Sequence, residues 1–123
     1  MEDHYKLEFL DETIKSAYYC LKSYKNRGNK NMSCYVVVLG NKLDEDSFNA
    51  YAEVAGPSIV NSGGEVVSRG PLATLSGATH FKMMVVVKFP SRERAEGWYN
   101  SSEYQAIIPT RDKGLEALFV MSD

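Results

Sequence analysis

One stretch near the C-terminal end, residues 89–105, constrains the fold more than any other part of the chain. An apolar run ends at Phe89, and Pro90 cannot extend it because proline lacks a backbone N–H. Ser91 is placed to cap a helix, and residues 101–103 (Ser-Ser-Glu) are placed to cap a second helical segment. The stretch therefore predicts a strand, a stop and then the second helix of a small α+β unit, built in two pieces.

Strand and helix patterns alternate through the rest of the chain. A helix is expected from Asp44 to the glycine pair at 63–64, with a kink at Pro57, and the last helix should break or restart at Pro109. Apolar alternation predicts strands at 34–40, 65–70, 80–89 and 115–121. The order strand, helix, strand, strand, helix, strand predicts a ferredoxin-like βαββαβ fold, with a four-stranded antiparallel sheet and both helices on one face.

Residues 1–31 stand apart from this unit, which is expected to occupy residues 32–123. Asp11 is placed to cap a helix whose apolar positions include Ile14 and Tyr18, and residues 26–31 have the composition of a linker. We expect an N-terminal helical extension that docks by its apolar stripe. A lid or a dimer arm is the functional alternative.

The strands are apolar on both of their alternating faces, which has an energetic consequence. Two helices cover only one face of the sheet, and exposed apolar surface costs about 25 cal/mol per Å². Either the N-terminal helix or a second copy of the chain must cover the other face. We favour the second copy, so that two sheets face each other in a homodimeric α+β barrel.

Composition excludes several classes of function. A net charge of -2 gives no reason to expect a nucleic-acid or membrane-surface partner. Cys20 and Cys34 are too few for a disulfide framework, and the N-terminal segment lacks the apolar core of a signal peptide, so a cytoplasmic location is expected. No phosphate loop, dinucleotide fingerprint or zinc spacing is present, so we expect neither a cofactor nor a metal.

Several short motifs together resemble one known family. They are Tyr-Ala-Glu-Val-Ala-Gly-Pro at 51–57, Gly-Gly at 63–64, Ser-Arg-Gly at 68–70, Phe-Pro-Ser at 89–91, Trp-Tyr at 98–99, Ser-Glu-Tyr-Gln at 102–105 and Arg111. This combination, spread over residues 35–120, resembles the domain of unknown function 1330 family. The resemblance implies a dimeric α+β barrel, a fold that includes cofactor-independent monooxygenases. It transfers no catalytic residue.

Two arginines stand where a charge needs an explanation. Arg69 lies within a strand and shares a face with Val67, so it is expected either to bind a small anion, such as a carboxylate or enolate, or to form an ion pair with Glu65 or a helix carboxylate. Arg111 lies on the apolar stripe of its helix. It is expected to lie over Tyr104 or to pair with Glu103 or Glu116, and it is also a candidate ligand contact.

The remaining candidate site residues are a histidine and a set of aromatic side chains. His80 opens the longest predicted strand and is a candidate proton carrier near neutral pH, although a solvated histidine is the commoner situation. Aromatic residues of this kind lie more often in the core or in an interface than in a ligand site. They are also able to shape a pocket or orient a ligand oxygen, and they are Tyr35, Tyr51, Trp98, Tyr99 and Tyr104.

Two functions remain open on the sequence. The first is a small-molecule site in a dimeric barrel, acting as a cofactor-independent enzyme such as a monooxygenase or isomerase on an oxygenated or aromatic compound. The alternative is a non-catalytic dimerisation or interaction module whose sheet face is filled by side chains.

Overall fold

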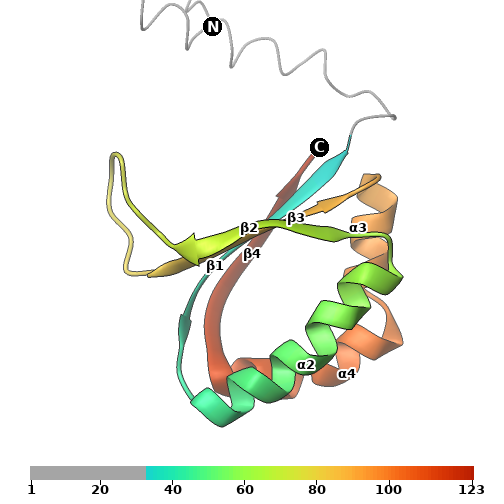
Figure 1. The fold of residues 1–123 in the computed structure, drawn as a ribbon, viewed down its shortest axis with the longest axis horizontal. Helices are drawn as coiled ribbons and strands as arrows, with labels where there is room; N and C mark the ends of the chain where they lie inside the picture. Colours follow the sequence, from blue (N-terminus) through green and yellow to red (C-terminus); the bar gives the residue numbers. More distant parts are fainter. Residues whose placement is uncertain (1–32) are drawn as a thin grey trace, which may run out of the picture. The chain divides into compact units, whose positions relative to one another are not determined.

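A computed structural model describes residues 33–123, which form a four-stranded antiparallel sheet with three helices on one face (Figure 1). The strand order is β2-β3-β1-β4. The elements are β1 (Cys34–Lys42), α2 (Glu45–Asn61), β2 (Glu65–Pro71), β3 (Met83–Phe89), α3 (Arg92–Tyr99), α4 (Ser102–Gly114) and β4 (Leu115–Ser122). The ferredoxin-like order and the two-piece second helix are therefore confirmed. The predicted N-terminal helix lies outside the described residues.

Side-chain caps begin each helix: Ser91 and Ser101 cap as the sequence predicts, and Asp44 caps the helix that was expected to begin there. The Oδ2 atom of Asp44 accepts a hydrogen bond from the backbone N–H of Ser47 at 2.9 Å. Ser91 caps α3 and Ser101 caps α4 in the same way, each through its hydroxyl oxygen. Gly63 has φ +85, the left-handed conformation that a glycine adopts without steric cost just beyond the end of α2.

The predicted break at Pro109 is wrong. Helix α4 runs without interruption from Ser102 to Gly114. Helix α2 continues through Pro57 as one helix, and the kink expected there stays a prediction. A proline inside a helix costs about 3 kcal/mol. Packing between the two helices outweighs this cost, because Tyr104 and Ile107 of α4 belong to the same core as Tyr51 and Ala55 of α2.

The strand predicted over 80–89 is shorter in the structure, where β3 begins at Met83. The backbone N–H of Lys82 bonds to the Asn41 side chain at 2.8 Å, and Leu72 N donates to the Lys82 carbonyl at 2.8 Å. These bonds close the base of the hairpin that joins β2 to β3. His80 therefore lies in the hairpin loop and does not open a strand.

A β-bulge in β2 changes the side on which Arg69 lies. The register against β3 shifts between Val66 and Ser68, so the predicted simple alternation of Val67 and Arg69 on one face is wrong. Arg69 lies opposite Val85, a residue of the helix-facing set, whereas Ser68 lies opposite Val86 on the other face.

The core lies between the sheet and the helices. Its buried members are Cys34, Val36, Tyr51, Ala55, Ile59, Val87, Phe89, Ala95, Trp98, Tyr104 and Leu115. The opposite face, here called the open sheet face, carries Tyr35, Val37, Leu39, Met84, Val86, Leu118 and Val120. These side chains form rows across three strands, such as Met84, Leu39 and Leu118. Leu118 is 47% exposed and Val120 is 48% exposed, so an apolar surface faces solvent in the single chain.

No helix within residues 33–123 is long and apolar enough to cross a membrane.

Candidate functional site

A hydrogen-bonded group of tyrosines and one arginine lies between the two long helices and the sheet. The hydroxyls of Tyr51 and Tyr104 are 2.8 Å apart, which joins α2 to α4. Arg111 donates from Nη1 to the hydroxyl oxygens of Tyr104 at 3.2 Å and Tyr99 at 3.1 Å. The group therefore links α2, α3 and α4 through polar atoms at the centre of an aromatic core.

The guanidinium of Arg111 is held mainly by aromatic groups. Its side chain is only 13% exposed, and its Cζ lies 4.8 Å from the centre of the Phe119 ring. Its carboxylate contact is Asp112 Oδ1 at 3.1 Å, a largely exposed group, and the predicted pairing with Glu103 or Glu116 is not seen. Burial opposes the charged form, but hydrogen bonds to Tyr99 and Tyr104 outweigh burial, and the pKa of Arg111 is raised above its usual value. The site therefore holds a permanent positive charge.

Trp98 is fixed by a second polar connection between α3 and α2. Its indole N–H donates to Ser58 Oγ at 3.0 Å, and Ser58 Oγ donates to the Ala55 carbonyl at 2.7 Å. Trp98 is buried and its ring centre lies 4.6 Å from that of Tyr104. Because the indole nitrogen and Ser58 Oγ both have hydrogen-bond partners, the Trp98 ring is held in one orientation.

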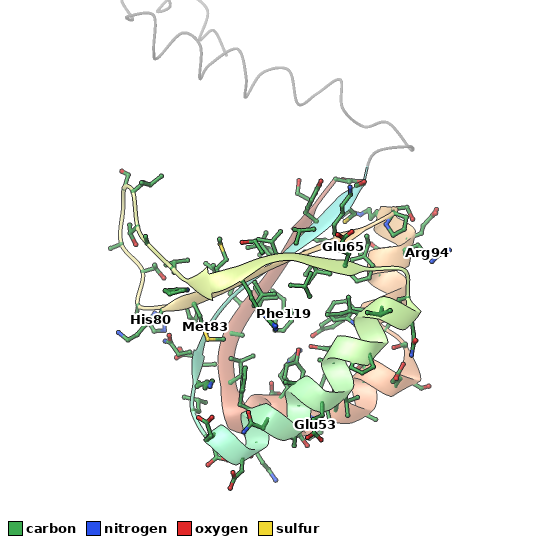
Figure 2. The ribbon with its side chains drawn as sticks, in the orientation of Figure 1. Glu53, Glu65, His80, Met83, Arg94 and Phe119 are labelled. Atoms are coloured by element: carbon green, nitrogen blue, oxygen red, sulfur yellow. The ribbon has the colours of Figure 1, made fainter. Side chains whose placement is uncertain are left out.

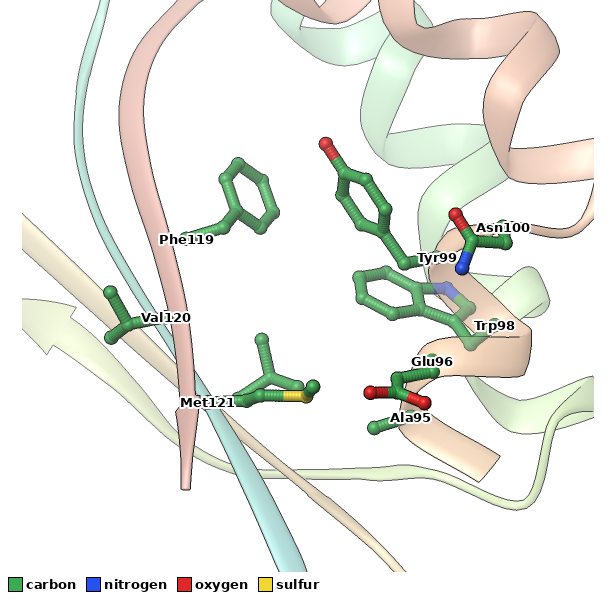
Figure 3. Close-up of a pocket in the computed structure, with 9 residues that line it drawn as sticks. Ala95, Glu96, Trp98, Tyr99, Asn100, Phe119, Val120 and Met121 are labelled. Atoms are coloured by element: carbon green, nitrogen blue, oxygen red, sulfur yellow. The ribbon is translucent and has the colours of Figure 1, made fainter. Parts of the chain in front are cut away.

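An apolar cavity of about 330 Å³ opens beside the Trp98 ring, between α3 and β4. Figure 3 shows Phe119 and Met121 on one side of it, with Trp98, Tyr99 and Glu96 on the other. Val36 and Ala95 also line it, and the exposed residues Glu96 and Asn100 supply polar groups. The Glu96 carboxylate is offset by Arg92 Nε at 3.4 Å. This space, the α3–β4 cavity, has the aromatic walls and few polar groups that small-molecule sites have.

The tyrosine group gives the fold a dependence on alkaline pH. Burial, then the neighbouring Tyr104, raises the pKa of Tyr51, and burial also raises that of Tyr104 against the lowering effect of its hydrogen bonds. The folded chain keeps both phenolic protons where an unfolded chain, with a tyrosine pKa of about 10, begins to release them. Stability is thus fully present below pH ~10 and is lost as pH rises further.

Replacing Tyr51 by phenylalanine is expected to make this alkaline loss of stability shallower. Each such tyrosine contributes a slope of up to about 1.4 kcal/mol per pH unit to the free energy of unfolding. Urea denaturation at a series of pH values from neutral to strongly alkaline measures the slope in both proteins. Equal slopes for the wild type and Tyr51→Phe would contradict the account of this group.

The structure brings together five of the eight predicted site residues. Tyr51, Trp98, Tyr99, Tyr104 and Arg111 form one cluster on the helix side of the sheet. Tyr35 lies on the open sheet face instead.

Arg69 and His80 lie outside that cluster. Arg69 is exposed on the edge strand β2, and no ion pair joins it to Glu65 or to another carboxylate within residues 33–123. His80 lies in the β2–β3 hairpin loop, apart from Phe119 (Figure 2). Its Nε2 is 2.7 Å from Glu116 Oε2.

Sequence reasoning missed three contributors to the site: Ser58, Glu96 and Phe119. Ser58 follows Tyr51 and Ala55 at helical spacing, a signal that places it on the buried stripe of α2. Phe119 alternates with exposed residues along β4. Nothing in the sequence singles out Glu96 from Glu93, the other exposed acidic residue of α3. No cluster of three or more potential metal ligands occurs in the part of the chain that the structure describes.

Together the fold and the site define a ferredoxin-like α+β protein with an aromatic cavity on the helix side of its sheet. Residues 33–122 match the family described as a domain of unknown function (DUF1330), and the chain belongs to this family. The predicted resemblance is therefore confirmed. No curated protein matches the chain.

Solved structures with the same fold are distant in sequence. A protein of unknown function from Rhodopseudomonas palustris is 16% identical, with a TM-score of 0.63 over 83% of this chain and 89% of that one. A dimeric ferredoxin-like protein of unknown function from Thermobifida fusca is 11% identical, with a TM-score of 0.53 over 76% and 92%. SnoaB, a cofactor-independent oxygenase from Streptomyces nogalater, is 5% identical, with a TM-score of 0.55 over 74% and 91%. At these identities the likeness concerns the fold alone.

Proposed function

We propose that this protein is a homodimer that binds a small aromatic compound in the α3–β4 cavity of each copy. The ligand carries an oxygen atom that accepts a hydrogen bond, and a carboxylate, phenolate or enolate suits the site best. The observation that carries the proposal is the aromatic cavity next to a charged, hydrogen-bonded Arg111.

Tyr99 connects the cavity to the charge. Its ring lines the cavity, and its hydroxyl oxygen accepts a hydrogen bond from Arg111 at 3.1 Å. Within residues 33–123 the hydroxyl proton of Tyr99 has no acceptor, so it is free to donate to a ligand. A cation that bonds to a phenol oxygen polarises the O–H group and strengthens its donation to an anionic acceptor. This favours an anionic oxygen over a neutral one.

The homodimer is supported by the open sheet face. Its rows of apolar side chains across β3, β1 and β4 make a continuous surface that a second copy would remove from water. The relative from Thermobifida fusca, which shares the fold, is described as dimeric. A second copy is therefore the occupant that we propose for this face.

Catalysis without a cofactor is a second candidate for the same cavity. Tyr99 and Arg111 are suited to hold the oxyanion that forms when a phenol or an enolisable ketone loses a proton. Such an anion is the species that a cofactor-independent monooxygenase or isomerase acts on, and SnoaB carries out oxygenation on this fold. The predicted role of His80 as a proton carrier stays a prediction. If the cavity binds no ligand, the remaining alternative is a non-catalytic dimerisation or interaction module.

Trp98 provides the test, because it is the sole tryptophan of the chain and forms a wall of the cavity. Titration with phenylacetate is expected to change tryptophan emission saturably, and its uncharged isostere phenylacetamide is expected to bind more weakly. Tyr99→Phe should weaken phenylacetate binding about tenfold, the usual worth of a hydrogen bond to a charged group. Ala95→Leu should abolish binding by filling the cavity.

Tyr35→Phe is the matched control, since it makes the same chemical change, loss of a phenol hydroxyl, on the open sheet face. It is expected to bind phenylacetate as the wild type does. Unchanged tryptophan emission with both compounds, or equal affinities for Tyr99→Phe and Tyr35→Phe, would overturn the proposed site.

A further inference from the structure

A second concavity lies toward the other end of β1 and β4 from the α3–β4 cavity. It has a volume of about 730 Å³ and is bounded by the start of α2, the end of β1 and the paired ends of β2 and β3. We call it the α2–β2 groove. The lining residues that matter here are Lys42, Phe48, Arg69, Lys82, Met83 and Glu116.

The groove concentrates positive charge on a chain whose net charge is -2. Three cationic side chains line it against one carboxylate, Glu116, which is already bonded to His80 at 2.7 Å. Lys42 is 3.5 Å from Glu45 at the rim. Neither Arg69 nor Lys82 has an ion-pair partner in the described part of the chain. Because three cationic residues line one concavity and two of them have no carboxylate partner there, the groove favours an anionic ligand.

The backbone around the groove is fixed by one side chain. Asn41 Oδ1 accepts from the Lys82 backbone N–H at 2.8 Å, and Asn41 Nδ2 donates to the His80 carbonyl at 3.2 Å and to Glu116 Oε1 at 3.5 Å. The β2–β3 hairpin is thereby tied to β1 and β4 at the point where Lys82 leaves it. A preformed rim lowers the entropy that a ligand must supply on binding.

Arg69 reaches the groove because of the bulge in β2. The register shift places it on the helix-facing side of the edge strand, opposite Val85. A charge that points inward from an edge strand also discourages strand pairing between molecules. Preventing strand pairing needs only Arg69. Lys82, just before β3, lines the same groove, and a second cation there is what an anion-binding site would need.

The floor of the groove is apolar and continues inward. Phe48, Met83 and Val85 line both the groove and a narrower space of about 140 Å³ between α2 and the sheet, and Arg69 borders both. A ligand is thus offered an apolar slot with cations at its mouth. We propose that the α2–β2 groove binds a small molecule with an apolar body and a dianionic group, held by Arg69 and Lys82. This site is independent of the α3–β4 cavity.

Phenyl phosphate and benzene-1,2-dicarboxylate are suitable probes, because they place a phosphate or a pair of carboxylates on the same apolar ring. Titration followed by amide NMR of the full chain should shift the Gly70 and Lys82 signals saturably, at constant ionic strength. Which probe binds more tightly identifies the dianion. Benzyl alcohol, which has the ring without the charge, is expected to cause no saturable shift.

Arg69→Gln and Lys82→Gln should each weaken binding of the preferred dianion about tenfold, since each removes a charge-assisted hydrogen bond. Lys113→Gln is the matched control, because it removes one positive charge from an exposed site at the end of α4. Equal weakening in all three variants, or no saturable shift with either dianion, would overturn the inference. The tryptophan titration of the α3–β4 cavity should be unchanged in Arg69→Gln, so the two proposals fail separately.

Discussion

Replacing Leu118 by lysine is expected to convert the proposed dimer into monomers. Leu118 lies opposite Leu39 on the open sheet face, in the row that continues to Met84. A two-fold interface through this face would remove two introduced ammonium groups from water, one from each copy. Each desolvated charge costs several kcal/mol unless it is paired, so the dissociation constant should rise at least about a thousandfold.

Val60→Lys is the matched control for this experiment. Val60 is 68% exposed on α2, on the helix side of the molecule, and the substitution changes charge and hydropathy in the same way. Sedimentation equilibrium over a range of protein concentrations should show a dimer for the wild type and Val60→Lys, and a monomer for Leu118→Lys. A Leu118→Lys protein that remains a dimer of wild-type stability would show that this face is not the interface.

Replacing Gly114 by alanine is expected to destabilise the fold by about 3 kcal/mol, at the upper end of the usual cost of overpacking. Gly114 ends α4 where the start of α2 crosses it, and an added Cβ would clash with the backbone of Ser47 and Phe48. The obstructing atoms belong to backbone, which cannot move aside as a flexible side chain can. The substitution therefore forces apart α2 and α4, the helices that the Tyr51–Tyr104 hydrogen bond joins.

Gly97→Ala is the corresponding control, because nothing lies within 4 Å of the Cβ that it would add to α3. It should stabilise the chain by up to about 1 kcal/mol, the difference in helix propensity between glycine and alanine. Chemical denaturation of both variants measures the two effects. A Gly114→Ala protein as stable as the wild type would mean that the two helices do not approach so closely.

The order of elements follows from local signals that act over a few residues. Asp44, Ser91 and Ser101 cap helices because their side-chain oxygens bond to the next turn, and those signals are readable in the sequence. Alternation along β1 and β4 correctly separated the helix-facing residues from the open face. The break expected at Pro109 was wrong because packing against α2 outweighs the cost of the proline. That packing involves residues distant in sequence and leaves no local signal.

The candidate site was less predictable because it depends on register and on long-range pairing. The bulge after Val66 moves Arg69 to the other face, and no residue type marks that shift. Tyr51, Tyr104 and Arg111 were candidates as single residues, but their meeting follows from the crossing of α2 and α4. The Asn41 side chain was not a candidate, although it makes two hydrogen bonds to the hairpin and a third to Glu116 of β4.

A crystal structure of the full chain with 4-bromophenylacetate tests the central claim most directly. Anomalous scattering locates the bromine independently of any interpretation of the ring. We expect bromine between Trp98, Phe119 and Met121, the ligand oxygen within hydrogen-bonding distance of the Tyr99 hydroxyl, and a second copy against Leu118. An empty α3–β4 cavity with bromine elsewhere, or a Leu118 face left in solvent, would contradict the claim.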